Sequence, residues 1–413
     1  MELVRTLEVS GTEIVELPVH HYARQYGRSQ FFRVRSLAVT FLQLCAVFYR
    51  LVVAPAIAGT ESSDRNGPAR FSRRQAALVA FSVLELSILA YGRALSLPFI
   101  SDDYLQIKLA RDYGSISNWG ALAHDALYRC RATSLVLTYW LDGAIGLTPL
   151  YYNLASLLLH VVDSLLVFAL GMWRPVGWRV AGLAACFFAV SQRHSEAVVW
   201  FSAVPELLVF FFVVGCFLFW IRWLNTRSAP ILTYAGALGC YLLALLSKES
   251  EVAVVPLCVL AVLVHPARPL RKLWGMAPFA LIAGAYFGLD YAARQTHLHF
   301  NDGTFSLSAP FVETLLRSMG GLLWVWGFVS LLVLFTKTAR PWRPLLMLAA
   351  VWMAVTLLPY SFLTYMPRVP SRHTYMASVG LSFIVAAGML AFRQYARRWN
   401  RVWPVPLPAC LIV

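Results

Sequence analysis

Residues 198–221 read Val198-Val-Trp-Phe-Ser-Ala-Val-Pro-Glu-Leu-Leu-Val-Phe-Phe-Phe-Val-Val-Gly-Cys-Phe-Leu-Phe-Trp-Ile221. Glu206 is the only acidic or basic residue of this run. A helix that crosses about 30 Å of hydrocarbon needs roughly 20 mostly apolar residues, and this run is long enough. The stretch therefore predicts a membrane-spanning helix and sets the class of the fold.

The composition of the whole chain agrees with this class. Hydrophobic residues make up 59% of the 413 residues and charged residues 13%, with a mean hydropathy of +0.63. Soluble domains carry about 25% charged residues, so we expect an all-α polytopic membrane protein. Further apolar runs predict spans at 75–97, 150–173, 178–192, 229–247, 251–264, 274–291, 314–336, 344–361 and 374–392.

The net charge of +15 indicates orientation rather than a nucleic-acid partner, because Lys and Arg cluster between the apolar runs. Residues 131–148 are apolar but contain Asp142 and two glycines. If this stretch is a membrane-surface or re-entrant helix, every basic connection falls on the cytoplasmic side. The sequence thus predicts about 10–11 transmembrane helices and a large first extracytoplasmic loop that carries juxtamembrane helices.

The chain divides into four predicted regions. Residues 1–60 are polar, basic and patchily apolar, and their apolar stretch 36–58 is either an interfacial helix or a span. Residues 61–74 form a basic linker. Residues 75–392 form the transmembrane domain. Residues 393–413 are expected to be a basic cytoplasmic segment that ends in the start of a truncated further span.

Asp102 and Asp103 follow the first span of the transmembrane domain directly. Carboxylates beside lipid are costly, which favours a functional role such as general base toward an attacking hydroxyl. The alternative is a solvated cap, in which Ser101 or Asp102 caps a helix that runs from Tyr104 to Arg111. Tyr104 and Arg131 of the same loop are expected to support the site.

Further ionisable clusters fall on the same predicted side, namely His194 with Glu196, Lys248 with Glu249, and Arg368 with Arg372 and His373. A lysine there can neutralise a lipid phosphate, and the arginine-rich loop suits an anionic headgroup or a leaving phosphate. The alternatives are a hydrated turn, a Lys–Glu pair within a turn, and interfacial anchoring.

Acidic residues also lie within predicted spans and should face the bundle interior, as structural partners or as functional groups: Glu85, Asp163, Glu206 and Asp290. The seven cysteines show neither a C-x-x-C pair nor a framework spacing. We therefore expect neither a structural disulfide nor a metal site.

Four blocks resemble the GT-C membrane glycosyltransferases, in particular the protein O-mannosyltransferase-like and transmembrane and tetratricopeptide-repeat enzymes. They are the Asp-Asp loop, Gln192-Arg-His-Ser-Glu-Ala-Val-Val-Trp200, Leu245-Leu-Ser-Lys-Glu249 and Arg372-His-Thr-Tyr-Met-Ala-Ser-Val-Gly380. The resemblance implies that Asp102 or Asp103 is the catalytic base. It also implies that Lys248 and Arg372 contact the phosphate of a lipid-linked donor. His373 stands where tyrosine is commoner in that family.

A second resemblance concerns Val19-His-His-Tyr-Ala-Arg-Gln-Tyr-Gly-Arg-Ser-Gln-Phe31. This segment is similar to the C-terminal tail of polyprenyl-phosphate sugar synthases of the dolichol-phosphate-mannose type. The resemblance implies a fused or partner synthase domain that makes the lipid-linked sugar.

The expected function is transfer of a sugar from a polyprenyl phosphate to an acceptor hydroxyl, with inversion, on the extracytoplasmic side of the membrane. The expected partners are the bilayer, the polyprenyl-phosphate sugar and a glycan, lipid or protein acceptor, with no cofactor or metal. The alternative is a flippase or transporter of lipid-linked saccharides, which would need charged groups along a path through the bilayer.

Overall fold

The computed structural model describes residues 73–225, 231–248, 250, 253–267, 269–293, 306, 308–335, 341–363 and 369–402. These residues are 84% helical and contain no strand, which confirms the all-α prediction for the described part. The synthase-tail-like segment, nearly all of the basic linker, Glu249, Arg368 and the proposed truncated span lie outside these residues.

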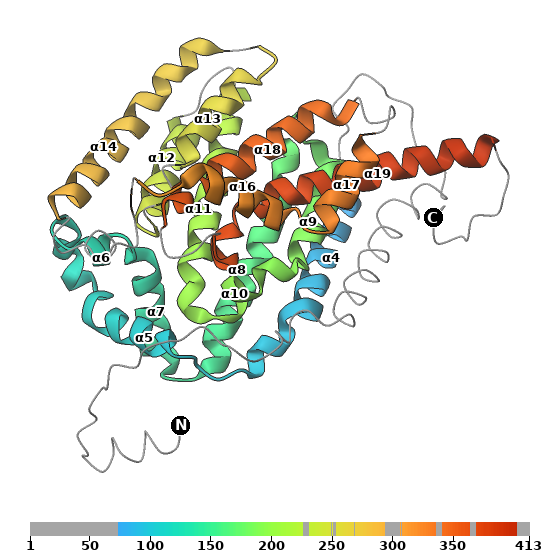
Figure 1. Ribbon diagram of the computed structural model, residues 1–413. Coiled ribbons are helices and arrows are strands. Elements are labelled where there is room, and N and C mark those ends of the chain that lie inside the picture. The colour runs from blue at the N-terminus through green and yellow to red at the C-terminus, as the bar shows by residue number, and fades with distance from the viewer. Residues whose placement is uncertain are drawn as a thin grey trace. The chain divides into compact units, whose positions relative to one another are not determined.

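The principal helices are α4 (Arg73–Tyr91), α5 (Asp102–Tyr113), α6 (Ala126–Arg129), α7 (Ala132–Ile145), α8 (Pro149–Ala169), α9 (Gly177–Ala189), α10 (Ser195–Val199), α11 (Val204–Asn225), α12 (Ile231–Leu245), α13 (Val254–Leu263), α14 (Ala277–Ala292), α16 (Phe311–Leu322), α17 (Trp326–Leu334), α18 (Arg343–Leu357) and α19 (Ser378–Val402) (Figure 1). Short 3-10 turns connect several of them. Those beside the candidate site are η6 (Gln192–His194), η7 (Phe201–Ala203), η11 (Pro359–Phe362) and η12 (Ser371–Thr374).

Five helical segments are long and apolar enough to cross a membrane, or six if a bent pair is one span. They are Arg74–Ser96, Pro149–Met172, Phe201–Asn225, Leu270–Ala292 and Ser378–Tyr395, with the bent pair α16 and α17. Helices α9, α12, α13 and α18 are apolar but shorter. The long apolar helices of the described residues indicate a membrane-embedded protein, and the multi-pass arrangement with 10–11 spans stays a prediction.

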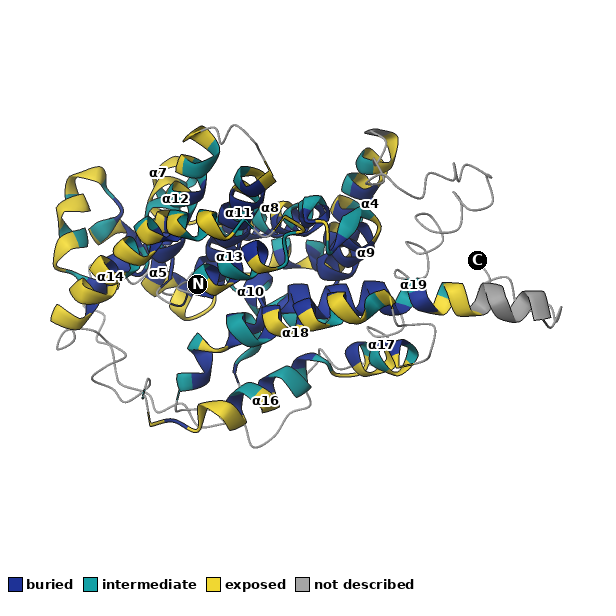
Figure 2. Ribbon diagram, turned by 90° about the horizontal axis from the view of Figure 1, so that it is seen from above, coloured by how far each residue is buried: buried dark blue, intermediate teal, exposed yellow. Residues whose placement is uncertain are grey.

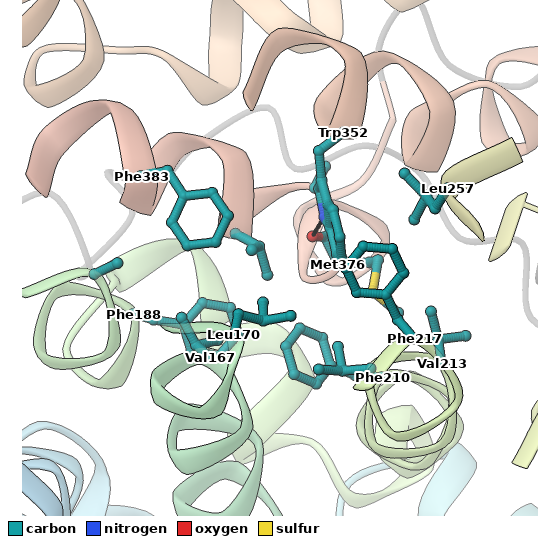
Figure 3. Close-up of a cluster of buried hydrophobic side chains, with 14 of the residues drawn as sticks. Val167, Leu170, Phe188, Phe210, Val213, Phe217, Leu257, Trp352, Met376 and Phe383 are labelled. Carbon is teal, nitrogen blue, oxygen red and sulfur yellow. Dashed lines mark hydrogen bonds between the residues drawn. The ribbon is translucent and has the colours of Figure 1, made fainter. Parts of the chain in front are cut away.

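The core lies where α8, α9, α11 and α19 meet. In α11 and α19, 72% of the apolar window is buried inside the protein, against 22% in the segment that contains α14. Figure 2 also shows α9 as largely buried and α14 as largely exposed. Phe188, Phe210 and Phe217 pack in the core, where the Trp352 indole N–H donates to the Met376 carbonyl over 3.0 Å (Figure 3). An outer surface rich in apolar side chains suits contact with lipid.

The loop after α4 carries short helices, as predicted. Helix α7 has 14 residues and packs against α5 (Figure 1). At about 1.5 Å per residue it is roughly 21 Å long, which is too short to cross the hydrocarbon. Helices α9, α12, α13 and α18 have 10 to 15 residues, so length alone does not separate 131–148 from the predicted spans, and its course stays a prediction.

The predicted span 314–336 is two helices that meet at 86°. Val325, between α16 and α17, has a φ of 52°, which is unfavourable for a β-branched residue. Gly320 and Gly321, which have weak helix propensity, directly precede Leu322, the last residue of α16. The hydropathy pattern that predicted the span contains no information on this bend.

Candidate functional site

Asp103 ties the first loop to the start of α11. The side chain is buried, and its two carboxylate oxygens accept from the backbone N–H groups of Ile100 and Ser202, each over 2.8 Å. Burial raises the pKa of Asp103, although these two hydrogen bonds act in the opposite direction. Both carboxylate oxygens are therefore engaged in holding the loop against η7.

Asp102 differs from Asp103 in its exposure and in its hydrogen bonds. It is exposed and is the first residue of α5, where the helix dipole favours a negative charge. The hydroxyl of Ser101 lies 3.3 Å from Asp102 Oδ1. Ser101 occupies the N-cap position without a side-chain capping hydrogen bond, and Asp102 is already inside the helix, so neither residue caps a helix that begins at Tyr104. The φ of Ser101 is 33°, a strained conformation of the kind that concentrates at functional sites.

Glu196 and Arg372, predicted in separate clusters, form an ion pair. Glu196 Oε2 accepts from the Ser371 hydroxyl and, over 3.0 Å, from the Arg372 backbone N–H. The guanidinium also lies 5.1 Å from the ring centroid of Trp200. Burial alone would raise the pKa of Glu196, but Ser371 and Arg372 outweigh it and lower the pKa.

A cavity of about 380 Å³ opens beside this pair. It is lined by Arg193, Glu196, Ser318, Gly321, Leu322, Val369, Pro370, Ser371, Arg372 and Thr374. The Arg193 guanidinium donates to the Gly321 carbonyl and so joins η6 to the end of α16. Two arginines and one glutamate give the wall a net positive charge, which favours an anionic group.

Lys248 lies in a buried polar cluster with Glu206 and His373. The Lys248 ammonium pairs with Glu206 and lies 3.0 Å from His373 Nδ1, which is 2.6 Å from Glu206 Oε1. Tyr360 donates to Glu206 Oε2 over 3.1 Å and stacks on His373, with ring centroids 4.6 Å apart. Burial and the nearby Lys248 charge lower the pKa of His373 to about 4, so the imidazole is neutral at pH 7.

One nitrogen cannot both donate to a carboxylate and accept from an ammonium. Because the Lys248 ammonium already has Glu206 as its anionic partner, a neutral His373 that donates from Nδ1 to Glu206 satisfies all three groups. Contact between Lys248 and a donor phosphate stays a prediction that would require this pair to open. The intramembrane position of Glu206 was the signal that pointed to a partner in the bundle interior.

Three other predicted site residues, Tyr104, Arg131 and His194, lie outside the cavity wall. His194 is fully buried, with Nε2 2.6 Å from the Ser378 hydroxyl. Arg131 precedes α7 and donates to the Cys130 carbonyl over 2.8 Å. Tyr104 is partly exposed and its ring packs edge-on against Phe99. None of these three side chains lines the cavity.

Among the acids of the predicted spans, Asp163, Glu206 and Asp290 are buried, as predicted, and Glu85 is half-buried. Asp290 pairs with Arg129 of the first loop through two hydrogen bonds of 2.6 and 3.0 Å. This pair fastens α14 to α6.

Two contacts place the loop and the cavity at the same end of the bundle. Asp103 binds the backbone of Ser202, and Trp200, two residues earlier, lies against the guanidinium of Arg372. The segment from Glu196 to Ser202 therefore contacts both the start of α5 and the cavity wall. Asp102 is not one of the cavity-lining residues, so a substrate held there would have to extend toward α5 to reach it.

No protein family, no curated protein and no solved structure matches this chain. Within the described residues, no group of three or more His, Cys, Asp or Glu side chains is arranged to hold a metal ion.

Proposed function

We propose that the protein is an integral membrane glycosyltransferase of GT-C type. It transfers a sugar from a polyprenyl phosphate to an acceptor hydroxyl, with inversion and without a metal, on the extracytoplasmic side. The observation that carries the proposal is the cavity beside Arg372. Arg372 is a half-buried cation that pairs with Glu196. The cavity lies at the same end of the bundle as the exposed Asp102, the first residue of α5.

Arg372 is the group proposed to bind the phosphate. A guanidinium has five N–H donors, and the side chain is 26% exposed, so the ion pair with Glu196 leaves part of it accessible. The net positive wall supports binding of a phosphate ester. Arginine can also stabilise the charge that grows on the departing phosphate in the transition state.

Asp102 is proposed as the general base because Asp103 is buried and already bonded at both oxygens. The Asp102 carboxylate takes the proton of the acceptor hydroxyl as the hydroxyl oxygen bonds to the anomeric carbon. The bond from that carbon to the phosphate oxygen breaks, and the polyprenyl phosphate leaves as an anion beside Arg372. Attack opposite the leaving group inverts the anomeric configuration.

Lys248 and His373 are proposed to support the cavity wall from the bundle interior. His373 directly follows Arg372 in η12, and Lys248 with Glu206 holds that turn from the bundle interior. Reorientation of the Lys248 ammonium toward the donor phosphate would add a second cation at the leaving group.

The test is transfer of radiolabelled mannose or glucose from synthetic polyprenyl-phosphate sugars to endogenous acceptors in membranes that contain the protein. Arg372→Ala should lower the rate by about 10²–10³-fold, as loss of a transition-state charge partner does. Arg317→Ala is the matched control, because Arg317 is exposed on α16 and pairs with Glu313 of the same helix. Movement of the labelled lipid across proteoliposomes without any new glycosidic bond would contradict the proposal and favour a flippase.

A further inference from the structure

A second buried polar group lies directly beneath the candidate site, between α8 and the start of α19. His160 and Asp163 are fully buried on α8, and Tyr375 is 1% exposed. The Tyr375 phenol oxygen lies 2.8 Å from His160 Nδ1 and 3.1 Å from Asp163 Oδ2. His160 Nε2 is 3.2 Å from the carbonyl oxygen of Ala189. The four groups form one continuous chain.

The positions of the protons in this chain follow from donor counting. The Ala189 carbonyl can only accept, so His160 Nε2 must carry a hydrogen. Tyr375 has a single hydroxyl proton for its two neighbours, His160 and Asp163. Two arrangements satisfy every contact. In one, all groups are neutral, Asp163 donates to Tyr375, and Tyr375 donates to His160. In the other, a doubly protonated His160 donates to Tyr375, and Tyr375 donates to an ionised Asp163.

The surroundings favour the neutral arrangement. Aromatic rings enclose His160, with the rings of Tyr91, Phe188 and His194 centred 5.1 to 5.9 Å from its own. No cation pairs with Asp163 among the residues that the structure describes. Separating a positive and a negative charge in such a site carries a large desolvation cost, which a neutral acid and a neutral imidazole avoid.

We infer that Asp163 is a protonated carboxylic acid that donates to Tyr375, and that this neutral chain is a positioning device for the turn carrying Arg372. The positioning part rests on the proposed function. Tyr375 stands three residues after Arg372, and its backbone N–H donates to the Arg372 carbonyl over 3.2 Å. The Ser378 hydroxyl donates to the Tyr375 carbonyl over 2.7 Å. Tyr375 is thus fixed at its backbone and at its phenol, and η12 with it.

The protonation state can be tested without any activity. Infrared spectra of the purified protein at neutral pH should contain the C=O stretch of a protonated carboxylic acid, and Asp163→Asn should remove it. Tyr375→Phe should move that band to higher frequency, because the acid loses its acceptor. A neutral-pH spectrum in which Asp163→Asn removes only carboxylate absorption would overturn the inference, whatever the outcome of the transferase assay.

Conservative replacement separates positioning from folding. Asparagine can donate its amide N–H to Tyr375, so Asp163→Asn should keep the thermal unfolding midpoint and the transfer rate near those of the wild-type protein. Asp163→Leu cannot donate and should lower kcat about tenfold or more at saturating donor, through misplacement of Arg372. If Asp163→Asn impairs folding as strongly as Asp163→Leu, the chain is charged and the inference fails. If the infrared result holds and no variant transfers sugar, the proposed function fails instead.

Discussion

Glu196 binds Arg372 at both its backbone and its side chain: Oε2 accepts from the Arg372 N–H over 3.0 Å, and Oε1 pairs with the guanidinium. This double contact fixes the direction of the arginine at the cavity wall. It also joins α10 to η12, since Glu196 and Arg372 are 176 residues apart in the chain.

Replacement of Glu196 should therefore separate the effect of its negative charge from its effect on the position of Arg372. Glu196→Gln keeps an oxygen that can accept from the backbone N–H, whereas Glu196→Ala loses every contact. We expect transfer to fall about tenfold in the glutamine variant and about 10²–10³-fold in the alanine variant, within the range for positioning and charge-stabilising groups. Initial rates with a polyprenyl-phosphate sugar provide the measurement. Equal rates in the two variants would show that the contact with the Arg372 backbone N–H does not contribute to transfer.

The pH dependence of stability should have opposite signs for Glu196 and Asp103. The pKa of Glu196 is lowered in the fold, so its contribution is present above its unfolded pKa and is lost as pH falls through the folded pKa. The pKa of Asp103 is raised, so its contribution is present below its unfolded pKa and is lost as pH rises through the folded pKa.

The measurement is the thermal unfolding midpoint in detergent across the acid range, for wild type, Glu196→Gln and Asp103→Asn. Relative to its variant, the wild-type protein should gain stability with rising pH in the Glu196 comparison and lose it in the Asp103 comparison. The same sign in both comparisons would contradict the assignment of the two carboxylates.

The buried Glu206–Lys248 pair predicts a strongly coupled pair of substitutions. Lys248→Met leaves Glu206 without its cation and should destabilise the fold by about 3–5 kcal/mol, as removal of one buried partner does. The double variant with Glu206→Gln should recover most of this loss. Additive effects of the two single substitutions on unfolding free energy would show that the pair is not coupled.

A comparison of two arginines tests the attachment of α14. Arg129 and Asp290 are both buried, so Arg129→Met should cost about 3–5 kcal/mol. Arg111 pairs with Asp142 at the surface and its side chain is 54% exposed, so Arg111→Met should cost about 0–1 kcal/mol. Thermal unfolding of the two variants side by side provides the measurement, and equal losses would contradict the assigned burial.

The sequence predicts the helical membrane class well because apolar runs long enough to cross a bilayer rarely occur in soluble folds. It also predicts that Glu206 faces inward. It cannot identify Lys248 as the partner of Glu206, because that contact joins residues 42 positions apart and depends on how α11 and α12 pack. The bend at Val325 is invisible to hydropathy, which counts apolar residues and not backbone angles.

The two aspartates show the same limit at the site. Asp102 and Asp103 are equivalent by local sequence, and either one fits a helix start or a general base. They differ in burial because the backbone N–H of Ser202 donates to the Asp103 carboxylate, while Asp102 stays exposed. Only the packing of α5 against η7 separates the two roles.

The most direct test of the account is the rate of sugar transfer from a polyprenyl-phosphate donor by Asp102→Asn and Asp103→Asn in matched membranes. Asp102→Asn should keep the wild-type unfolding midpoint and reduce transfer by about 10²–10⁴-fold, as loss of a general base does. Asp103→Asn should lower the midpoint and retain more of the activity. Wild-type transfer by a well-folded Asp102→Asn protein would contradict the central claim.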